Sequence, residues 1–83
     1  MYRIIISPQA KKELKIIRKV YRKGLAEAIE SIKDDPQLGK PLARELRGKL
    51  SYRVGIYRII YKVNDQDKTV QVIAAGHRGT VYK

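Results

Sequence analysis

The chain contains no cysteine, no tryptophan, no phenylalanine and a single histidine, His77, among its 83 residues. The absence of cysteine excludes disulfide scaffolds, cysteine zinc sites, iron–sulfur clusters and thiol nucleophiles. One histidine leaves no imidazole pair for a metal site or for a nuclease that uses two histidines. Most acidic side chains fall in the expected helices and at Asp65 and Asp67, away from the basic cluster described below. We therefore expect no carboxylate-held magnesium and no other cofactor.

Long apolar runs are also missing from the sequence. No stretch approaches the roughly 20 apolar residues that a membrane-spanning helix needs, and Met1 to Ser7 lacks the features of a signal peptide. We expect a cytoplasmic protein with no membrane partner. A chain this short buries only about 60 to 65% of its unfolded surface. The sequence therefore predicts a single domain over residues 1–83, with one modest core and a shallow site.

Acidic residues are scarce: 8 Asp and Glu stand against 19 Lys and Arg, which gives a formal net charge of +11. With 43% hydrophobic residues the chain can fold, so this charge belongs to a globular body and not to a disordered tail. Contacts with many phosphates release counterions and steer association, so a polyanion is the expected partner. The alternative is a charge that only keeps the protein soluble.

The first half of the chain predicts a strand followed by helices. Tyr2–Ile6 is a short β-branched run, after which Ser7 suits a helix N-cap and Pro8 suits the first helical position. Between residues 10 and 32 the apolar residues recur at the spacing of an amphipathic helix. We expect a break at Gly24 that folds two helices into a hairpin, with one long helix kinked at Gly24 as the alternative.

The second half of the chain changes to the period of strands. Asp34-Asp35-Pro36 stops the helical pattern, and residues 36–44 are expected to form a loop. Three strands follow, at residues 51–54, 57–63 and 69–75, and form an antiparallel meander. The whole is an α+β fold with an N-terminal strand, a two-helix hairpin and a three-stranded antiparallel meander, the helices packing on one face of the sheet.

The spacing around Gly55-Ile56 predicts a pair of arginines. A two-residue type II′ turn there places Arg53 directly opposite Arg58 on one face, together with Ser51 and Lys62. The alternating tyrosine and aliphatic residues of the same strand then face the helices. Like charges opposed across strands repel, and an anionic ligand explains their presence on this exposed basic face. The alternative is two solvated arginines whose stems pack on Ile60.

Two further groups carry positive charge. The C-terminal residues 76–82 place His77, Arg78 and Tyr82 after the last strand, although such a tail is more often a solvated end. Cleavage of nucleic acid by this chain would use arginine stabilisation of the phosphate, with proton transfer through Tyr82, His77 or a substrate group, and would need the 2′-hydroxyl of RNA as nucleophile. Bases of the first helical region can grip RNA phosphates or simply form a solvated face: Lys11, Lys15, Arg18, Lys19 and Arg22.

An ordered set of motifs resembles the RelE/ParE superfamily of toxin–antitoxin toxins. The motifs are YRIIISPQA at residues 2–10 with KEL at 12–14, DP at 35–36, GKPL at 39–42, LRG at 46–48, YRVG at 52–55, YRIIY at 57–61, and GHR at 76–78 followed by VY at 81–82. They span essentially the whole chain. The resemblance is to the RelE-like branch and implies a fold like that of the microbial ribonucleases.

The resemblance also implies a function. RelE-like toxins cleave mRNA in the ribosomal A site without a metal, by attack of the 2′-hydroxyl on the adjacent phosphate, and an antitoxin neutralises them. Arg58 matches the arginine that stabilises transition-state charge, and Arg78 matches the arginine assigned to phosphate stabilisation or leaving-group protonation. Tyr82 matches the tyrosine that orients or activates the 2′-hydroxyl. The implied partners are an acidic RelB-like antitoxin, the ribosome and mRNA. The toxin–antitoxin complex is expected to bind operator DNA through the antitoxin.

Two positions depart from the RelE pattern. Arg53 falls where some members carry a lysine proposed as general base, and an arginine stays protonated, so its role would be electrostatic. Ser51 stands where some members have a second lysine. The competing readings are a ParE-like toxin that poisons DNA gyrase and a non-catalytic basic module that binds nucleic acid.

Overall fold

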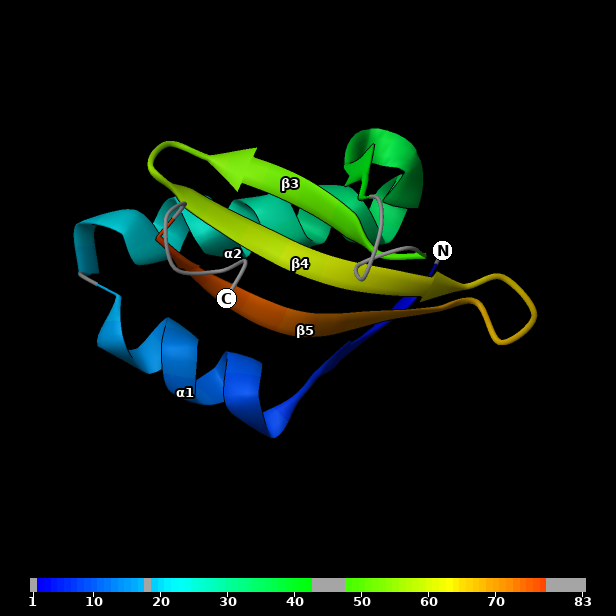
Figure 1. Cartoon of the computed structure of the whole chain (residues 1–83), viewed down its shortest axis with the longest axis horizontal. Coiled ribbons are helices and arrows are strands. Elements are labelled where there is room, and N and C mark those ends of the chain that lie inside the picture. The colour runs from blue at the N-terminus through cyan, green and yellow to red at the C-terminus, as the bar shows by residue number, and fades with distance from the viewer. Residues whose placement is uncertain (1, 18, 43–47, 78–83) are drawn as a thin grey trace.

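The computed structural model describes residues 2–17, 19–42 and 48–77 (Figure 1). In chain order the elements are β1 (Arg3–Ile6), α1 (Pro8–Ile16), α2 (Lys19–Asp34), the 3₁₀ helix η1 (Pro36–Leu38), β2 (Lys40–Pro41), β3 (Leu50–Val54), β4 (Tyr57–Asn64) and β5 (Thr69–His77). The predicted α+β order of one strand, two helices and three strands is confirmed. In these ranges no helix has the length and apolar character needed to cross a membrane.

The strands of the described ranges form one five-stranded sheet in the order β1-β5-β4-β3-β2. β3, β4 and β5 form the predicted antiparallel meander, and β1 pairs in parallel with β5. β2 is a two-residue strand at the far edge, paired with β3, and it lies in the segment expected to be a loop. That expectation is wrong for η1 and β2, because β2 pairs with β3 and the Tyr61 hydroxyl group of β4 donates to Pro36 O of η1. Figure 1 shows α2 behind the sheet and α1 alongside β5.

The break between the helices differs from the prediction. Helix α1 ends before Ile17, whose backbone is extended (φ −75°, ψ 138°) and whose side chain is buried in the core. Gly24 lies inside α2, where a Cβ atom would sit 3.5 Å from Val54 Cγ1, an ordinary contact. The hairpin break at Gly24 and the single kinked helix are therefore both wrong. The break falls instead at Ile17, which is buried in the core between the two helices.

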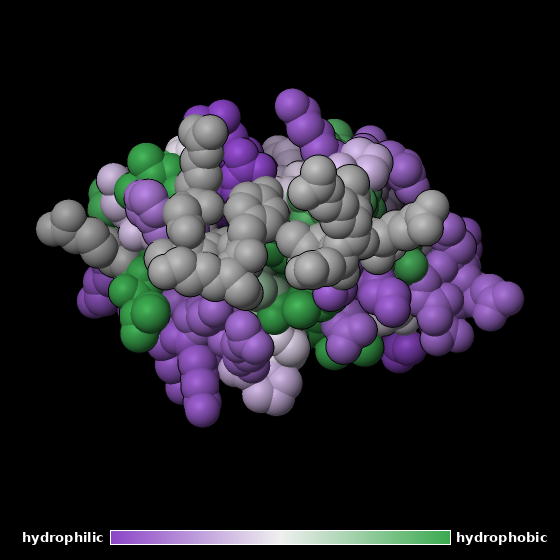
Figure 2. Space-filling view, viewed as in Figure 1, coloured by the Kyte–Doolittle hydropathy of each residue, from purple (hydrophilic) through white to green (hydrophobic). Residues whose placement is uncertain are grey.

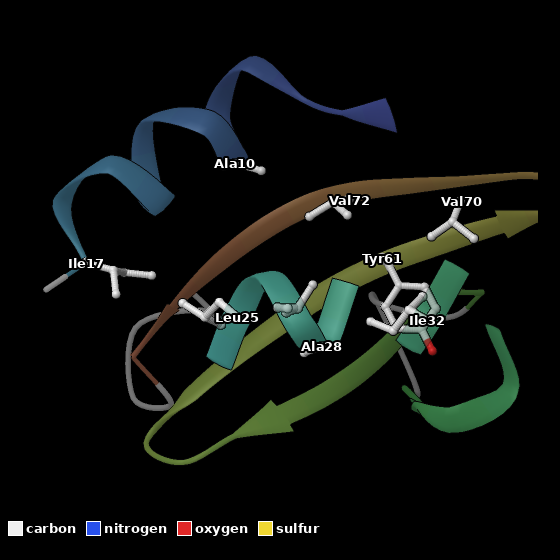
Figure 3. Close-up of a cluster of buried hydrophobic side chains, with 9 residues drawn as sticks. Ala10, Ile17, Leu25, Ala28, Ile32, Tyr61, Val70 and Val72 are labelled. Atoms are coloured by element: carbon white, nitrogen blue, oxygen red, sulfur yellow. The ribbon is translucent and has the colours of Figure 1, made fainter. Parts of the chain in front are cut away.

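One hydrophobic core joins both helices to the sheet (Figure 3). The apolar stripe of α2 packs on the inner face of β4 and β5, as the helical period predicts. The buried members of this core are Ala10, Ile17, Leu25, Ala28, Ile32, Ile59, Tyr61, Val70 and Val72. The helices thus cover one face of the sheet and leave the other face for a site.

Helix α1 takes over the edge of β5 where β1 ends. Ser7 is the predicted N-cap: its Oγ accepts a hydrogen bond from Ala10 N at 3.1 Å and donates one to Ile73 O at 2.9 Å. Further along, Ala75 N donates to Glu13 Oε1 at 3.0 Å. These side chains satisfy backbone groups of β5 that β1 no longer reaches, and so they protect an otherwise open edge.

Candidate active site

The β3–β4 hairpin carries the pair of arginines that the spacing predicts. Gly55 has a positive φ of 59°, as the first central position of a type II′ turn requires. Val54 pairs with Tyr57, so Arg53 lies in register with Arg58. A two-residue turn therefore sets the position of both guanidinium groups, and this prediction is confirmed.

Arg58 is held by a neighbouring hydroxyl group. Its Nη1 donates a hydrogen bond to Ser51 Oγ at 3.3 Å, and the Arg58 side chain is half-buried, whereas Arg53 is exposed. Ser51 is only 5% exposed. Its hydroxyl group thus orients the Arg58 guanidinium from within the protein, and does so without adding charge.

The face that carries the arginines has a buried centre. The alternation of β4 is confirmed, with Ile59 and Tyr61 in the core beneath the helices and Ile60 on the opposite face. Ile60 is 3% exposed and lies in register between Ser51 on β3 and Ala74 on β5. The face that the sequence predicts to be open is therefore not exposed at Ile60. Figure 2 shows this side of the molecule, where hydrophilic side chains lie beside hydrophobic ones.

A basic hollow of about 220 Å³ opens beside the arginine pair. The residues that line this basic hollow are Leu38, Lys40, Ser51, Tyr52, Arg53 and Arg58. Lys40 was not among the site residues expected from the sequence. The signal available was a lysine between Gly39 and Pro41, but its place beside the arginines depends on the pairing of β2 with β3. Among these described lining residues three carry positive charge and none carries negative charge, so the hollow suits an anion.

A second and larger hollow, of about 460 Å³, lies at the other end of the same face. Its charged lining residues are Arg3, Lys62, Asp65 and Asp67, and we call it the mixed hollow. Lys62, expected to bind RNA, is exposed and lies here rather than in the basic hollow.

His77 points to the other side of the sheet from Arg58. It pairs with Tyr57, and the two rings meet edge to face with centroids 6.3 Å apart. Tyr57 in turn packs against Tyr21 of α2, with centroids 5.0 Å apart. Paired residues share a face, so His77 stands on the helix side, whereas Arg58 pairs with Gly76. The structure does not bring His77 to the arginine pair.

The bases expected along the first helix are divided between two helices. Lys11 and Lys15 lie on α1, Lys19 and Arg22 lie on α2, and all four are exposed. Arg22 also has a structural role, since its Nε donates to Ile17 O at 2.9 Å and its Nη2 donates to Lys15 O. These bonds satisfy carbonyl groups at the end of α1, which the helix itself leaves without partners.

Three of the expected site residues lie outside the described residues: Arg18, Arg78 and Tyr82. Their assignments stay predictions. Within residues 2–17, 19–42 and 48–77, no group of three or more His, Cys, Asp or Glu side chains is arranged to hold a metal ion.

Two tyrosine hydroxyl groups anchor the ends of the arginine-bearing face. Tyr61 Oη donates to Pro36 O at 2.7 Å and accepts from Gly39 N at 2.9 Å, which ties η1 and the start of β2 to β4. Burial raises the pKa of Tyr61 above its ordinary value. At the mixed hollow, Tyr2 Oη donates to Asp65 Oδ1 at 2.7 Å, and this hydrogen bond raises the pKa of Tyr2. One anchor is buried and the other lies at the surface.

Solved structures with this architecture include RelE toxins in complex with antitoxins. The structure superposes on the RelBE2 toxin–antitoxin complex of Mycobacterium tuberculosis with a TM-score of 0.85 and 32% identity, covering 93% of this chain and 98% of that one. The archaeal RelE–RelB complex of Pyrococcus horikoshii OT3 gives a TM-score of 0.76 at 25% identity, covering 96% and 98%. The intact RelBE complex of E. coli shares the fold, with a TM-score of 0.79 at 22% identity, covering 93% of this chain and 96% of that one.

The sequence itself matches the ParE toxins of type II toxin–antitoxin systems (parDE) over residues 4–82, and the chain belongs to this family. Over 47 residues, or 57% of the chain, it is 43% identical to toxin RelG and 38% identical to toxin RelE of Mycobacterium tuberculosis. The matched stretches cover 54% and 48% of those proteins, so the chain spans about half the length of the curated relatives it matches. The predicted membership of the RelE/ParE superfamily is confirmed.

Proposed function

We propose that this chain is the toxin of a toxin–antitoxin pair and acts as a metal-independent, ribosome-dependent endoribonuclease that cuts mRNA in the A site. The observation that carries the proposal is the basic hollow, where Arg53 and Arg58 stand in register with no acidic side chain among the described lining residues. Such a site attracts a phosphate and stabilises further negative charge on it.

The proposed reaction is an internal phosphoryl transfer. The 2′-oxygen of one nucleotide forms a bond to the adjacent phosphorus and its proton passes to a base. The bond from phosphorus to the 5′-oxygen of the next nucleotide breaks, and that oxygen gains a proton. The products are a 2′,3′-cyclic phosphate and a 5′-hydroxyl end. The nucleophile belongs to the RNA, so the protein has to position the phosphate and move protons.

We assign the residues as follows. Arg58, oriented by Ser51, stabilises the charge that develops on the phosphate oxygens. Arg53 stays protonated and contributes electrostatically, so the base is Tyr82 or another group. Arg78 completes the phosphate contacts. The RNA contact surface is extended by Lys62 and by the helix bases Lys11, Lys15, Arg18, Lys19 and Arg22.

The proposed partners follow from the same assignment. The solved relatives include toxin–antitoxin complexes, and a chain with a net charge of +11 suits an acidic antitoxin of RelB type. We propose that the complex forms in the cytoplasm and binds operator DNA through the antitoxin. The match to ParE toxins keeps one competing function in view, a poison of DNA gyrase.

The decisive experiment is primer extension on an mRNA translated in a reconstituted system. We expect cuts at A-site codons with the wild-type chain and with Lys33→Ala, which removes one charge at the end of α2 from a residue that lines neither hollow. Arg58→Ala and Arg78→Ala should abolish the cuts, as should omission of ribosomes. Uncut mRNA with wild-type toxin would overturn the nuclease assignment. Inhibition of gyrase supercoiling that persists in Arg58→Ala would establish the competing function.

A further inference from the structure

We propose that Lys40 is a third phosphate-binding cation of the basic hollow and holds the RNA strand beside the phosphate that Arg58 contacts. This inference rests on the proposed ribonuclease function and names a further substrate-binding residue for it. Three independent features of the structure support it: the register of β2, the anchoring of the backbone around Lys40, and the charge of the hollow.

The register places Lys40 on the face of the arginine pair. Lys40 pairs with Ser51, and Ser51 pairs with Ile60 on β4. Residues paired across strands point to the same face, and so do residues two apart on one strand. Lys40 therefore shares a face with Arg53 and Arg58, and all three side chains line the same hollow.

The backbone that carries Lys40 is held on both sides. The residue before it, Gly39, donates its N–H to the buried Tyr61 hydroxyl, and the residue after it, Pro41, pairs with Leu50. A Cβ atom at Gly39 would lie 2.9 Å from carbons of the Tyr61 ring, which is why a glycine precedes the lysine. Tyr61 is fully buried. A binding residue on a fixed backbone needs little ordering when its ligand arrives.

The chemistry of Lys40 suits a neighbouring phosphate. Its side chain is exposed and carries a compact charge on a flexible stem, whereas Arg58 is half-buried and oriented by Ser51. An exposed cation at the rim of an otherwise basic hollow adds a point contact to a polyanion. The flexible lysine can follow the strand while the oriented arginine meets the reacting phosphate.

The contrast with Lys62 shows why Lys40 is singled out. Both lysines are exposed on the same face, but Lys62 shares its hollow with Asp65 and Asp67. Two carboxylates beside a lysine offset its attraction for phosphate. Lys40 has two arginines for neighbours in its hollow and no acidic side chain among the described lining residues.

The test measures binding of a single-stranded RNA made non-cleavable by 2′-O-methyl groups, by fluorescence anisotropy at several NaCl concentrations. Lys40→Ala should weaken binding about fivefold at low salt and reduce the slope of log affinity against log salt by about 0.7, the loss of one phosphate contact. Lys40→Arg should retain the affinity. Lys33→Ala is the charge-matched control and should change affinity less than twofold.

The outcomes separate this proposal from the proposed function. Equal binding by Lys40→Ala and Lys33→Ala would overturn the role of Lys40, even if wild-type toxin cuts mRNA on ribosomes. Weakened binding by Lys40→Ala, with wild-type toxin that leaves mRNA uncut, would retain Lys40 as an RNA contact and overturn the nuclease. Thermal unfolding of each variant shows whether a loss of affinity comes from a loss of the fold. Lys40→Met keeps the apolar stem of the side chain and removes its charge. A loss of binding in Lys40→Ala that is absent in Lys40→Met would also overturn the proposal.

Discussion

The basic hollow and the mixed hollow lie on one face of one sheet, yet they differ in both size and charge. The mixed hollow is the larger, at about 460 Å³ against about 220 Å³. Arg3 and Lys62 there share the surface with Asp65 and Asp67, whereas the described lining of the basic hollow has three cations and no acid. For a polyanionic substrate the sign and alignment of the charges matter more than the volume of the depression.

The two hollows also differ in how they are supported. At the basic hollow, the buried Tyr61 hydroxyl group bonds to two backbone groups, at Pro36 and Gly39. At the mixed hollow, Tyr2 makes one hydrogen bond to the side chain of Asp65 at the surface. A buried anchor fixes its surroundings more firmly, because loss of either partner leaves a polar group without water. The smaller hollow is thus the better organised of the two.

The largest expected effect comes from removing the oriented arginine. Arg58→Ala should lower the rate of mRNA cleavage by at least about 100-fold, as expected for loss of a group that stabilises transition-state charge. Lys62→Ala in the mixed hollow should lower it less than about threefold, since it removes one exposed phosphate contact. Primer extension on translating ribosomes gives both rates. Similar losses in the two variants would mean that the two hollows contribute alike.

The second prediction concerns the anchor of the basic hollow. Tyr61→Phe removes one donor and one acceptor from a buried site and should lower the free energy of unfolding by about 1–3 kcal/mol. Tyr2→Phe, at the mixed hollow, should leave it nearly unchanged because water replaces the lost bond. Urea denaturation at neutral pH measures both. Equal stability of the two variants would show that Tyr61 does not hold η1 and β2.

The third prediction uses pH to compare the same two anchors. Burial raises the pKa of Tyr61 in the folded state, so folding favours the neutral phenol. This contribution is complete below the ordinary tyrosine pKa of about 10 and is lost as pH rises through the folded value. Stability of the wild-type chain should therefore fall above about pH 10, and more gently in Tyr61→Phe. Urea midpoints at several alkaline pH values test this, and parallel pH profiles for the two proteins would contradict it.

The same reasoning applies to Tyr2 through a different cause. Its pKa is raised first by the hydrogen bond to Asp65, so Asp65→Asn should lower the Tyr2 pKa toward its ordinary value while leaving that of Tyr61 unchanged. An NMR titration of the tyrosine ring signals follows each group separately. A Tyr2 titration that does not respond to Asp65→Asn would exclude that hydrogen bond.

Local features made much of the fold predictable from the sequence. Ser7-Pro8 marks the start of α1, and Gly55-Ile56 fixes the hairpin that pairs Arg53 with Arg58, because both signals act within a few residues. The break between the helices carries no such signal. Ile17 leaves the helical conformation and is buried in the core, whereas Gly24, which resembles a breaker, lies inside α2. Burial in the core, which a local pattern does not display, accompanies the break at Ile17.

The candidate active site was likewise predictable only where local signals place its residues. The pairing of Arg53 with Arg58 follows from one turn, whereas the place of Lys40 depends on a two-residue strand too short to show a period. His77 follows β5 in the sequence, but its register with Tyr57 sends it to the helix side. Ser51 was expected at the RNA surface, and its burial instead makes it the support of Arg58. Long-range pairing, which a single sequence does not display, decided these three positions.

The smallest effect should come from changing the charge of the mixed hollow. Asp65→Asn removes one negative charge beside Lys62, so affinity for the non-cleavable RNA should rise about twofold at low salt. Asp34→Asn, at the end of α2, makes the same change in charge at a residue that lines neither hollow and should have less effect. Because the added attraction is solvent-exposed, it should vanish at high salt. A gain in affinity as large as the loss in Lys40→Ala would mean that RNA binds both hollows equally. It would also mean that the negative charge of the mixed hollow, and not its weaker anchoring, had kept RNA from binding there.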